Sequence, residues 1–293
     1  SMKSAAEHFG IIAYPHKERL HDKPIPLLGG VAIVFSFYIF IAFNYIVLRY
    51  IPQIDLYIPQ EIIPFVKGAL IRFPHLTVIL VCGLLIFLLG LIDDLKVLGP
   101  KRKILFQVFV GCILYFNGIR ITLFLGEGLC SLFFTVFWVV AITNAFNLLD
   151  NIDGLSAGIA VIASIILLIL CIQGRQILVS LLLVMFIAAL LGFLRYNYHP
   201  ASIFMGDAGS LFIGYIMSVL TIMSTFYYSR QLSIIPFVSP LLILAVPIYD
   251  MLSVVCIRIK NKKSIFNGDK NHFSHRLVRI GMGQRETVLF IYL

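Results

Sequence analysis

The chain is poor in charged residues and has no paired cysteine motif. Only 13% of its 293 residues are charged, whereas 60% are hydrophobic. Soluble domains carry roughly 25% charged and about 45–50% apolar residues. The five cysteines are scattered without CxxC spacing, which argues against both a disulfide framework and a zinc site. These shortages exclude an ordinary soluble domain and indicate a protein of the lipid bilayer.

Long apolar runs are abundant instead. A membrane-spanning helix needs about 20 mostly apolar residues. Runs near this length occur at 28–49, 74–92, 104–119, 131–149, 155–172, 177–194, 209–228 and 235–257, and residues 288–293 open a ninth candidate. We therefore predict an all-α, polytopic transmembrane helical bundle of about 8–9 spans, with residues 1–293 forming a single membrane-embedded domain.

The distribution of basic residues predicts how the bundle is oriented. If the segment before residue 28 lies in the cytoplasm, most Lys and Arg fall in cytoplasmic loops, as the positive-inside rule requires. The formal net charge of +9 is thus explained by topology, and nucleic acid is not expected as a partner. The polar motifs described below lie on the same side, so we predict an active site at the cytoplasmic face.

The first polar motif follows the second apolar run. Asp93 and Asp94 are adjacent there, and a basic segment that includes Lys101 comes next. Two neighbouring acids at a membrane interface suggest a magnesium site or a base, because Mg²⁺ takes one or two carboxylates together with phosphate oxygens and water. The alternative is a pair of solvated acids at a helix end, although acids there oppose the helix dipole.

The second motif is a polar stripe. Asn144, Asn147, Asp150 and Asp153 recur at every third position, so on a helix they follow one face toward its cytoplasmic end. Four converging amides and carboxylates suggest a ligand site. Interhelical hydrogen bonding within the membrane is the structural alternative.

The third motif surrounds Asp207, which Gly206 and Gly209 flank just before an apolar helix. A glycine-flanked acid at a helix start suits a metal bound beside phosphate, and simple helix capping is the alternative. Phe204 lies three residues earlier. Its composition fits the core, whereas an exposed ring there could stack on a nucleobase.

The last inner loop carries His272, His275 and Arg276. No cysteine or third histidine lies nearby, so phosphate oxygens are better partners for these side chains than zinc. A basic anchor at the membrane surface is the alternative. Asp250 lies in the preceding apolar run, and two interpretations stay open: a polar partner for a neighbouring helix, or part of the cleft.

The order of these motifs closely resembles the polyprenyl-phosphate N-acetylhexosamine-1-phosphate transferase family. The matching pieces are HxxPxPxxGG from His21, DD at Asp93, NxxNxxDxxDGL from Asn144, FMGDxGS from Phe204 and HxxHR from His272. Members of that family transfer a sugar 1-phosphate from a UDP-sugar to a membrane polyprenyl phosphate, release UMP and require Mg²⁺. The resemblance implies the same substrates, membrane lipid around the chain and the bacterial cytoplasmic (inner) membrane. Mn²⁺ as a substitute and a homodimer both stay open.

The resemblance also implies roles for individual residues. Those expected to be catalytic are Asp93, Asp94, Asp207 and His272, with Asp207 and Asp94 as metal ligands. Those expected to bind the nucleotide are Asn144, Asn147, Asp150, Asp153 and Phe204, the last two at the uracil. Those expected to bind phosphate are Lys101, His275 and Arg276.

The histidine spacing favours one branch of the family. The branch that uses UDP-N-acetylmuramoyl-pentapeptide has consecutive histidines in the last loop, whereas the branch that uses UDP-N-acetylglucosamine has HxxH followed by a basic residue, as found from His272 to Arg276. The second branch is therefore expected, and the first is the alternative. Because family members have one more span before the first motif and one or two after Val288, the resemblance predicts that this chain is a fragment.

Three other classes fit less well. A membrane prenyltransferase wants DxxxD clusters on two helices, and a CDP-alcohol phosphotransferase needs an extended DG…AR…G…D…D pattern, neither of which is present. A transporter should place charged residues near the bilayer midplane. Asp250 is the one residue that supports a transporter.

Overall fold

The structure, a computed structural model, describes residues 12–13, 25–50, 73–122, 128–228, 235–264 and 271–293. Its helices are α2 (Gly29–Tyr50), α4 (Phe73–Leu95), α5 (Pro100–Phe116), α6 (Leu129–Leu149), α7 (Leu155–Gln173), α8 (Ile177–Asn197), α9 (Gly206–Tyr228), α10 (Ile235–Ile243), α11 (Ala245–Lys260), α12 (Phe273–Arg279) and α13 (Gln284–Tyr292). Two short strands, β1 (Ile12–Ala13) and β2 (Ile25–Pro26), pair antiparallel. Residues 21–24, the first four of the motif segment that begins at His21, lie outside the described residues.

The helices form a multi-pass membrane bundle, which confirms the predicted all-α class apart from the two-residue strands. Six helices in the described part of the chain, α2, α4, α6, α7, α8 and α9, are long and apolar enough to cross a membrane. The predicted count of 8–9 spans is not confirmed. Helix α5 has only 17 residues and begins with a basic turn. The apolar run at 235–257 is divided between α10 and α11.

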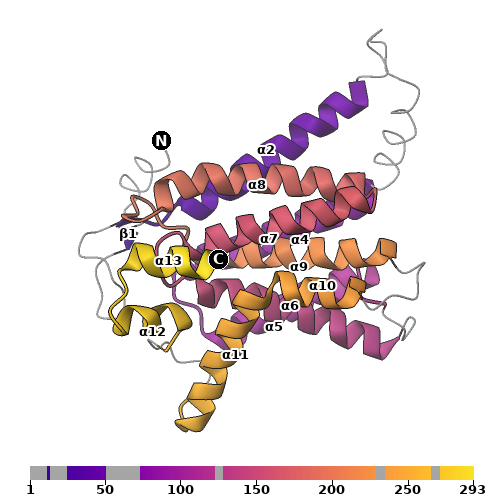
Figure 1. Ribbon diagram of the computed structural model, residues 1–293. Coiled ribbons are helices and arrows are strands. Elements are labelled where there is room, and N and C mark those ends of the chain that lie inside the picture. The colour runs from indigo at the N-terminus through magenta and orange to yellow at the C-terminus, as the bar shows by residue number, and fades with distance from the viewer. Residues whose placement is uncertain (1–11, 14–24, 51–72, 123–127, 229–234, 265–270) are drawn as a thin grey trace.

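The division of the last apolar run has a cause in the sequence. Pro247 has no backbone N–H to donate to the carbonyl of Ile243, and its ring would clash with that carbonyl in a continuous helix. Helix α10 accordingly ends at Ile243 and α11 begins at Ala245. Figure 1 shows α11 leaving the bundle at an angle to α10.

Helix α9 is the centre of the bundle. It is the most buried of the six candidate spans, and glycines let its neighbours approach its backbone closely, as is common between membrane helices. A Cβ on Gly90 of α4 would lie 2.4 Å from the carbonyl oxygen of Asp207, and one on Gly30 of α2 would lie 2.4 Å from the nitrogen of Gly209. Both contacts fall in the first turn of α9, where the third motif lies.

The chain direction places the polar motifs at one end of the bundle. Helices α4, α6 and α8 finish at this end and α7 and α9 start there, with β1, α12 and α13 alongside (Figure 1). The entry to α2 is fastened to the loop before α9 by backbone bonds: Gly29 and Gly30 donate to the carbonyls of Phe204 and Met205 at 2.9 and 3.0 Å, and the Phe204 nitrogen donates to Pro26 at 2.8 Å.

Close packing of α9 against α6 gives a stability prediction. A Cβ on Gly214 would lie 2.7 Å from the Cα of Thr143, so Gly214→Ala should push the helices apart and lower the melting temperature in detergent by several degrees. The matched control is Gly192→Ala in α8, where nothing lies within 4 Å. That change should leave the melting temperature equal or slightly higher, because alanine is favoured over glycine in a helix by about 0.5–1 kcal/mol. Equal melting temperatures for both variants would contradict the packing argument.

Candidate active site

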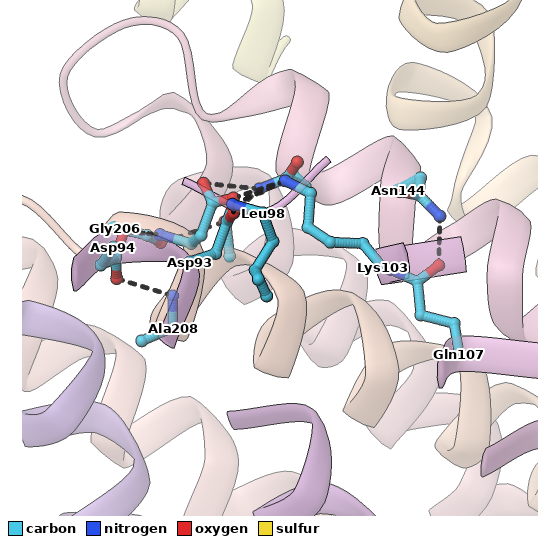
Figure 2. Close-up of polar contacts among 11 residues, drawn as sticks. Asp93, Asp94, Leu98, Lys103, Gln107, Asn144, Gly206 and Ala208 are labelled. Atoms are coloured by element: carbon cyan, nitrogen blue, oxygen red, sulfur yellow. Dashed lines mark hydrogen bonds and ion pairs between the residues drawn. The ribbon is translucent and has the colours of Figure 1, made fainter. Parts of the chain in front are cut away.

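Two carboxylates from different helices share one ammonium group at this end of the bundle. Lys103 of α5 places its Nζ 2.8 Å from Asp93 Oδ2 at the end of α4 and 2.8 Å from Asp207 Oδ2 at the start of α9. The Asp93 side chain is only 9% exposed and also accepts a hydrogen bond from the backbone nitrogen of Leu98 (Figure 2). Asp93 is therefore not a solvated acid at a helix end.

The bridging ammonium stays charged at neutral pH. Burial acts to lower the pKa of Lys103, but the charges of Asp207 and Asp93 and their hydrogen bonds outweigh burial, so the pKa lies above its ordinary value of 10.5. A raised pKa means that the stability which this bridge contributes is complete at neutral pH. It is lost only as the pH rises through the pKa of the folded state.

Asp94 has a different position from its neighbour. Its Oδ1 accepts a hydrogen bond from the Asp207 nitrogen at 2.8 Å, and its Oδ2 accepts one from the Ala208 nitrogen at 3.0 Å (Figure 2). These N–H groups belong to the first turn of α9, where a helix lacks internal acceptors and carries partial positive charge. Asp94 thus caps α9 from another helix, which leaves the Asp207 side chain directed to Lys103. Its predicted role as a metal ligand stays a prediction.

The asparagines of the polar stripe reach the same cluster. Asn147 Nδ2 donates to Asp207 Oδ1 at 3.1 Å and to Ser210 Oγ at 2.9 Å, which ties α6 to the first turn of α9. Asn144, one turn earlier on α6, donates to the side-chain oxygen of Gln107 in α5 (Figure 2). The two asparagines of the stripe therefore form hydrogen bonds between helices, and Asn147 also contacts an acid of the cluster.

The end of the stripe enters the turn between α6 and α7. Asp150 is half-buried at the end of α6. Asp153 Oδ2 lies 2.9 Å from His199 Nδ1 and accepts a hydrogen bond from the Ala201 nitrogen at 3.1 Å, so this carboxylate is joined to the loop before α9. Phe204, later in that loop, is half-buried.

Asn197 secures the same loop from the end of α8. Its side chain is buried, accepts a hydrogen bond from the Gly154 nitrogen at 3.0 Å and donates to the Ile203 carbonyl at 2.9 Å. Gly154 has φ +77°, a conformation that glycine adopts without strain. Asn197 is thus a second connection, beside Asp153, between the α6–α7 turn and the loop before α9.

The histidine segment is fastened to α11. His272 Nδ1 lies 2.8 Å from Asp250 Oδ2, and the Phe273 nitrogen donates to Asp250 Oδ1 at 2.7 Å. Asp250 is therefore the partner of the last loop. Its place in the cleft stays a prediction. His275 is buried with its ring centroid 6.0 Å from that of His272, whereas Arg276 is exposed.

Helices α12 and α13 also contact the α6–α7 turn. Ser274 Oγ donates to Asn151 Oδ1 at 2.6 Å, and Tyr292 Oη donates to the Gly154 carbonyl at 2.7 Å. The segment that carries the histidines therefore lies against the turn that carries Asp150 and Asp153. The two motifs are more than 100 residues apart in the chain and are joined only by tertiary structure.

Sequence reasoning selected Lys101 and passed over Lys103. Successive helical residues are rotated by about 100°, so these two lysines point in different directions. The structure leaves Lys101 exposed and brings Lys103 to the acids. The start of α5 at Pro100 was a usable signal for the helix, but only the position of α9 shows which lysine faces the acids. The predicted phosphate contact of Lys101 stays a prediction.

The acidic cluster suits a hard divalent cation. Asp93 and Asp207 already converge on one positive charge, and carboxylate oxygens are the ligands that Mg²⁺ prefers. Among the described residues no group of three or more His, Cys, Asp or Glu could hold a metal alone. A donor set of this size fits Mg²⁺ that is bound by one or two carboxylates and completed by substrate phosphate oxygens and water.

Fold and site together define a multi-pass membrane protein with a cluster of acids and amides at one end of its helical bundle, where the histidine segment lies against the α6–α7 turn. Comparison with known proteins places it more narrowly. Residues 76–225 match the model of glycosyl transferase family 4, and the chain belongs to that family. It is an enzyme of sugar-phosphate transfer, as the motif order predicted.

The relatives cover nearly all of the chain. A protein of Bacillus subtilis named a probable undecaprenyl-phosphate N-acetylglucosaminyl 1-phosphate transferase is 34% identical over 100% of this chain and 76% of its own length. The decaprenyl-phosphate N-acetylglucosaminephosphotransferase of Mycobacterium tuberculosis is 28% identical over 100% and 75%. The undecaprenyl-phosphate alpha-N-acetylglucosaminyl 1-phosphate transferase of Escherichia coli is 28% identical over 99% and 75%.

The lysine bridge gives a second stability prediction. Lys103→Met removes the charge that separates Asp93 from Asp207, so the free energy of unfolding should fall by about 1–3 kcal/mol. Thermal unfolding in detergent at pH 7 measures the change. Lys101→Met, two residues away and exposed, is the matched control and should unfold like the wild type. A Lys103 variant as stable as this control would show that the bridge contributes nothing to the fold.

Proposed function

We propose that the chain transfers N-acetylglucosamine 1-phosphate from UDP-N-acetylglucosamine to undecaprenyl phosphate or a similar polyprenyl phosphate and releases UMP. This would be the first membrane step of a cell-envelope glycan. The observation that carries the proposal is the meeting of Asp93, Asp94 and Asp207 around the Lys103 ammonium and the start of α9. The printed names of the relatives support the same substrates.

The proposed location is the bacterial inner membrane, with the acidic end of the bundle in the cytoplasm. Basic residues support this orientation, because the described chain near that end carries the basic turn of α5 and the arginines of α12. A soluble nucleotide sugar and a membrane-bound phosphate can meet only at such an interface. The acids would therefore lie where both substrates reach them.

The central physical problem is repulsion between two anionic substrates, because a lipid phosphate must approach the β-phosphorus of a pyrophosphate. Mg²⁺, when bound, would neutralise phosphate charge and polarise the phosphoryl oxygens. Asp207 and Asp93 are the residues that we propose to hold it, since both already face one cation. Asp94, the second predicted ligand, would keep α9 and Asp207 in place.

Other residues would bind and orient the substrates. Lys103 supplies a positive charge beside the acids. Its flexible side chain could bind a phosphate oxygen when the acids bind a metal. Asn147 holds Asp207 through its amide. Asp153 with Phe204 would contact the uracil. The phosphates would lie toward His275 and Arg276.

Direct attack by the lipid phosphate is the preferred reaction course. All three carboxylates of the cluster accept hydrogen bonds or ion pairs on both oxygens, which makes each a weaker nucleophile. A covalent phospho-aspartate is the alternative. Isolation of an enzyme-bound sugar phosphate would establish that alternative.

The transporter alternative loses its support. Asp250 was the one acid placed inside an apolar run, and its carboxylate is bound by His272 and Phe273 at the polar end of the bundle. The other acids of the site lie at helix ends. Phospho-N-acetylmuramoyl-pentapeptide transfer is the remaining alternative, and the choice of donor decides it.

The main test measures UMP release by the full-length protein in membranes with UDP-N-acetylglucosamine, undecaprenyl phosphate and Mg²⁺. Wild type should release UMP, and Asp207→Asn should reduce kcat by at least about 100-fold because it removes the charge at the centre of the cluster. Glu286→Gln is the control. It replaces an exposed acid of α13 by an amide whose oxygen can still accept the hydrogen bond of the Gly283 nitrogen, so this variant should retain activity.

Two outcomes would reject the proposal. One is the absence of UMP from wild type, and the other is undiminished release from Asp207→Asn. UMP release with UDP-N-acetylmuramoyl-pentapeptide but not with UDP-N-acetylglucosamine would establish the pentapeptide alternative instead.

The metal proposal has its own test. Chelation should abolish UMP release, and added Mg²⁺ should restore it. Binding of Mn²⁺ to the purified protein, followed by electron paramagnetic resonance, provides a readout that does not depend on activity. Asp207→Asn should weaken Mn²⁺ binding at least about tenfold, because one of two converging carboxylates is lost. Equal Mn²⁺ affinity in the variant and the wild type would place the metal elsewhere.

A further inference from the structure

Both carboxylate oxygens of Asp250 contact the segment that begins at His272. Asp250 Oδ2 lies 2.8 Å from His272 Nδ1, and Asp250 Oδ1 accepts the hydrogen bond of the Phe273 nitrogen at 2.7 Å. The side chains of Asp250 and His272 are 3% and 7% exposed. Tyr249 packs edge-on against Phe273 next to this contact. The histidine ring is therefore held in one orientation from α11.

We propose that Asp250 is a positioning residue that fixes the tautomer of His272 for the reaction. The inference rests on the proposed function. An ionised carboxylate only accepts hydrogen bonds, so the nitrogen facing it, Nδ1, carries the proton. Nε2 is then left with a lone pair on the opposite side of the ring, as in other histidines that a carboxylate orients.

Nε2 would accept the proton of the lipid phosphate. In this step the O–H bond of a phosphate hydroxyl breaks, its electron pair stays on oxygen, and a new N–H bond forms at Nε2. The phosphate gains the negative charge that attacks the β-phosphorus. The imidazolium that results has its positive charge between the Asp250 carboxylate and the phosphate, which stabilises it on both sides.

The substitution Asp250→Asn tests the tautomer without changing the shape of the residue. The Phe273 backbone N–H can only donate, so the new amide must turn its oxygen toward it. The amide NH₂ then faces Nδ1 of His272 and requires a lone pair there. The proton moves to Nε2, which can no longer accept one, although the number of hydrogen bonds is unchanged.

The experiment compares UMP release by four variants of the full-length protein with that of wild type. Asp250→Asn should lower kcat by about 100-fold or more, as expected for loss of a general base, while KM for both substrates stays within about threefold and the melting temperature is unchanged. His272→Gln should lower kcat to a similar extent. The double variant should be no slower than the slower single variant, because both changes remove the same function.

Ser253→Ala is the matched control on α11. Ser253 Oγ donates to the main-chain oxygen of Asp250 at 2.9 Å and does not touch its carboxylate. This variant should keep wild-type kcat. A loss of activity in Ser253→Ala equal to that in Asp250→Asn would mean that any disturbance of α11 is sufficient, and would overturn the proposal.

A second measurement reports the tautomer directly. In protein labelled with ¹⁵N-histidine, the His272 signals are assigned by their loss in His272→Gln. Wild type should show a protonated Nδ1 and an unprotonated Nε2, and Asp250→Asn should show the reverse. A wild-type ring with its proton on Nε2 overturns the proposal even if a variant fails to fold.

The outcomes separate this inference from the proposed function. If wild type releases no UMP, the proposed function fails and the proton-transfer role fails with it, whatever the tautomer. If wild type is active and folded Asp250→Asn has wild-type kcat, the proposed function stands and the role of Asp250 is wrong. Additive losses in the double variant would likewise show that the two residues act independently.

Discussion

The site depends on the compensation of carboxylate charge at the end of a membrane bundle. Buried charge is costly unless it is paired and hydrogen-bonded, and two different solutions occur side by side. Asp93 and Asp207 share the Lys103 ammonium, while Asp94 accepts the first backbone N–H groups of α9. Asp93 is thus paired with a side-chain charge and Asp94 with the backbone dipoles of a helix start, although the two acids are adjacent in the sequence.

The packing of α9 makes both solutions possible. Glycines on α2 and α4 bring neighbouring backbones within contact distance of its first turn. Asp94 can reach that turn only because the helices are this close. A helix start that is buried in the centre of a bundle would leave N–H groups without partners, and an acid from an adjacent helix satisfies them. The same contact sets the position of Asp207, so the packing of the helices determines the geometry of the site.

A second set of contacts joins the peripheral helices to the centre. Asn197 holds the α6–α7 turn against the loop before α9, and Ser274 and Tyr292 hold α12 and α13 against the same turn. Asp250 fastens the histidine segment to α11. These bonds cross between segments that bind different parts of the substrates in the proposed reaction. Their joint effect is to fix the relative positions of the residues that we propose for nucleotide binding, phosphate binding and proton transfer.

The sequence by itself determined the membrane class, the helical fold and the family. Apolar runs near the length of a bilayer have no other stable form than helices, and five motifs in fixed order identify the family without coordinates. It also indicated that Asn144 and Asn147 share a face, because helical periodicity is local. Pro247 carried the signal for the break between α10 and α11, which a count of apolar runs overlooked.

Only the tertiary structure decided which side chains are partners. It selected Lys103 over Lys101, gave Asp94 to α9 and paired Asp250 with His272. The physical reason is that periodicity specifies the face on which a residue lies but not what packs against that face. Such partners come from helices far apart in the chain, and their choice depends on the rotation and depth of each helix in the bundle.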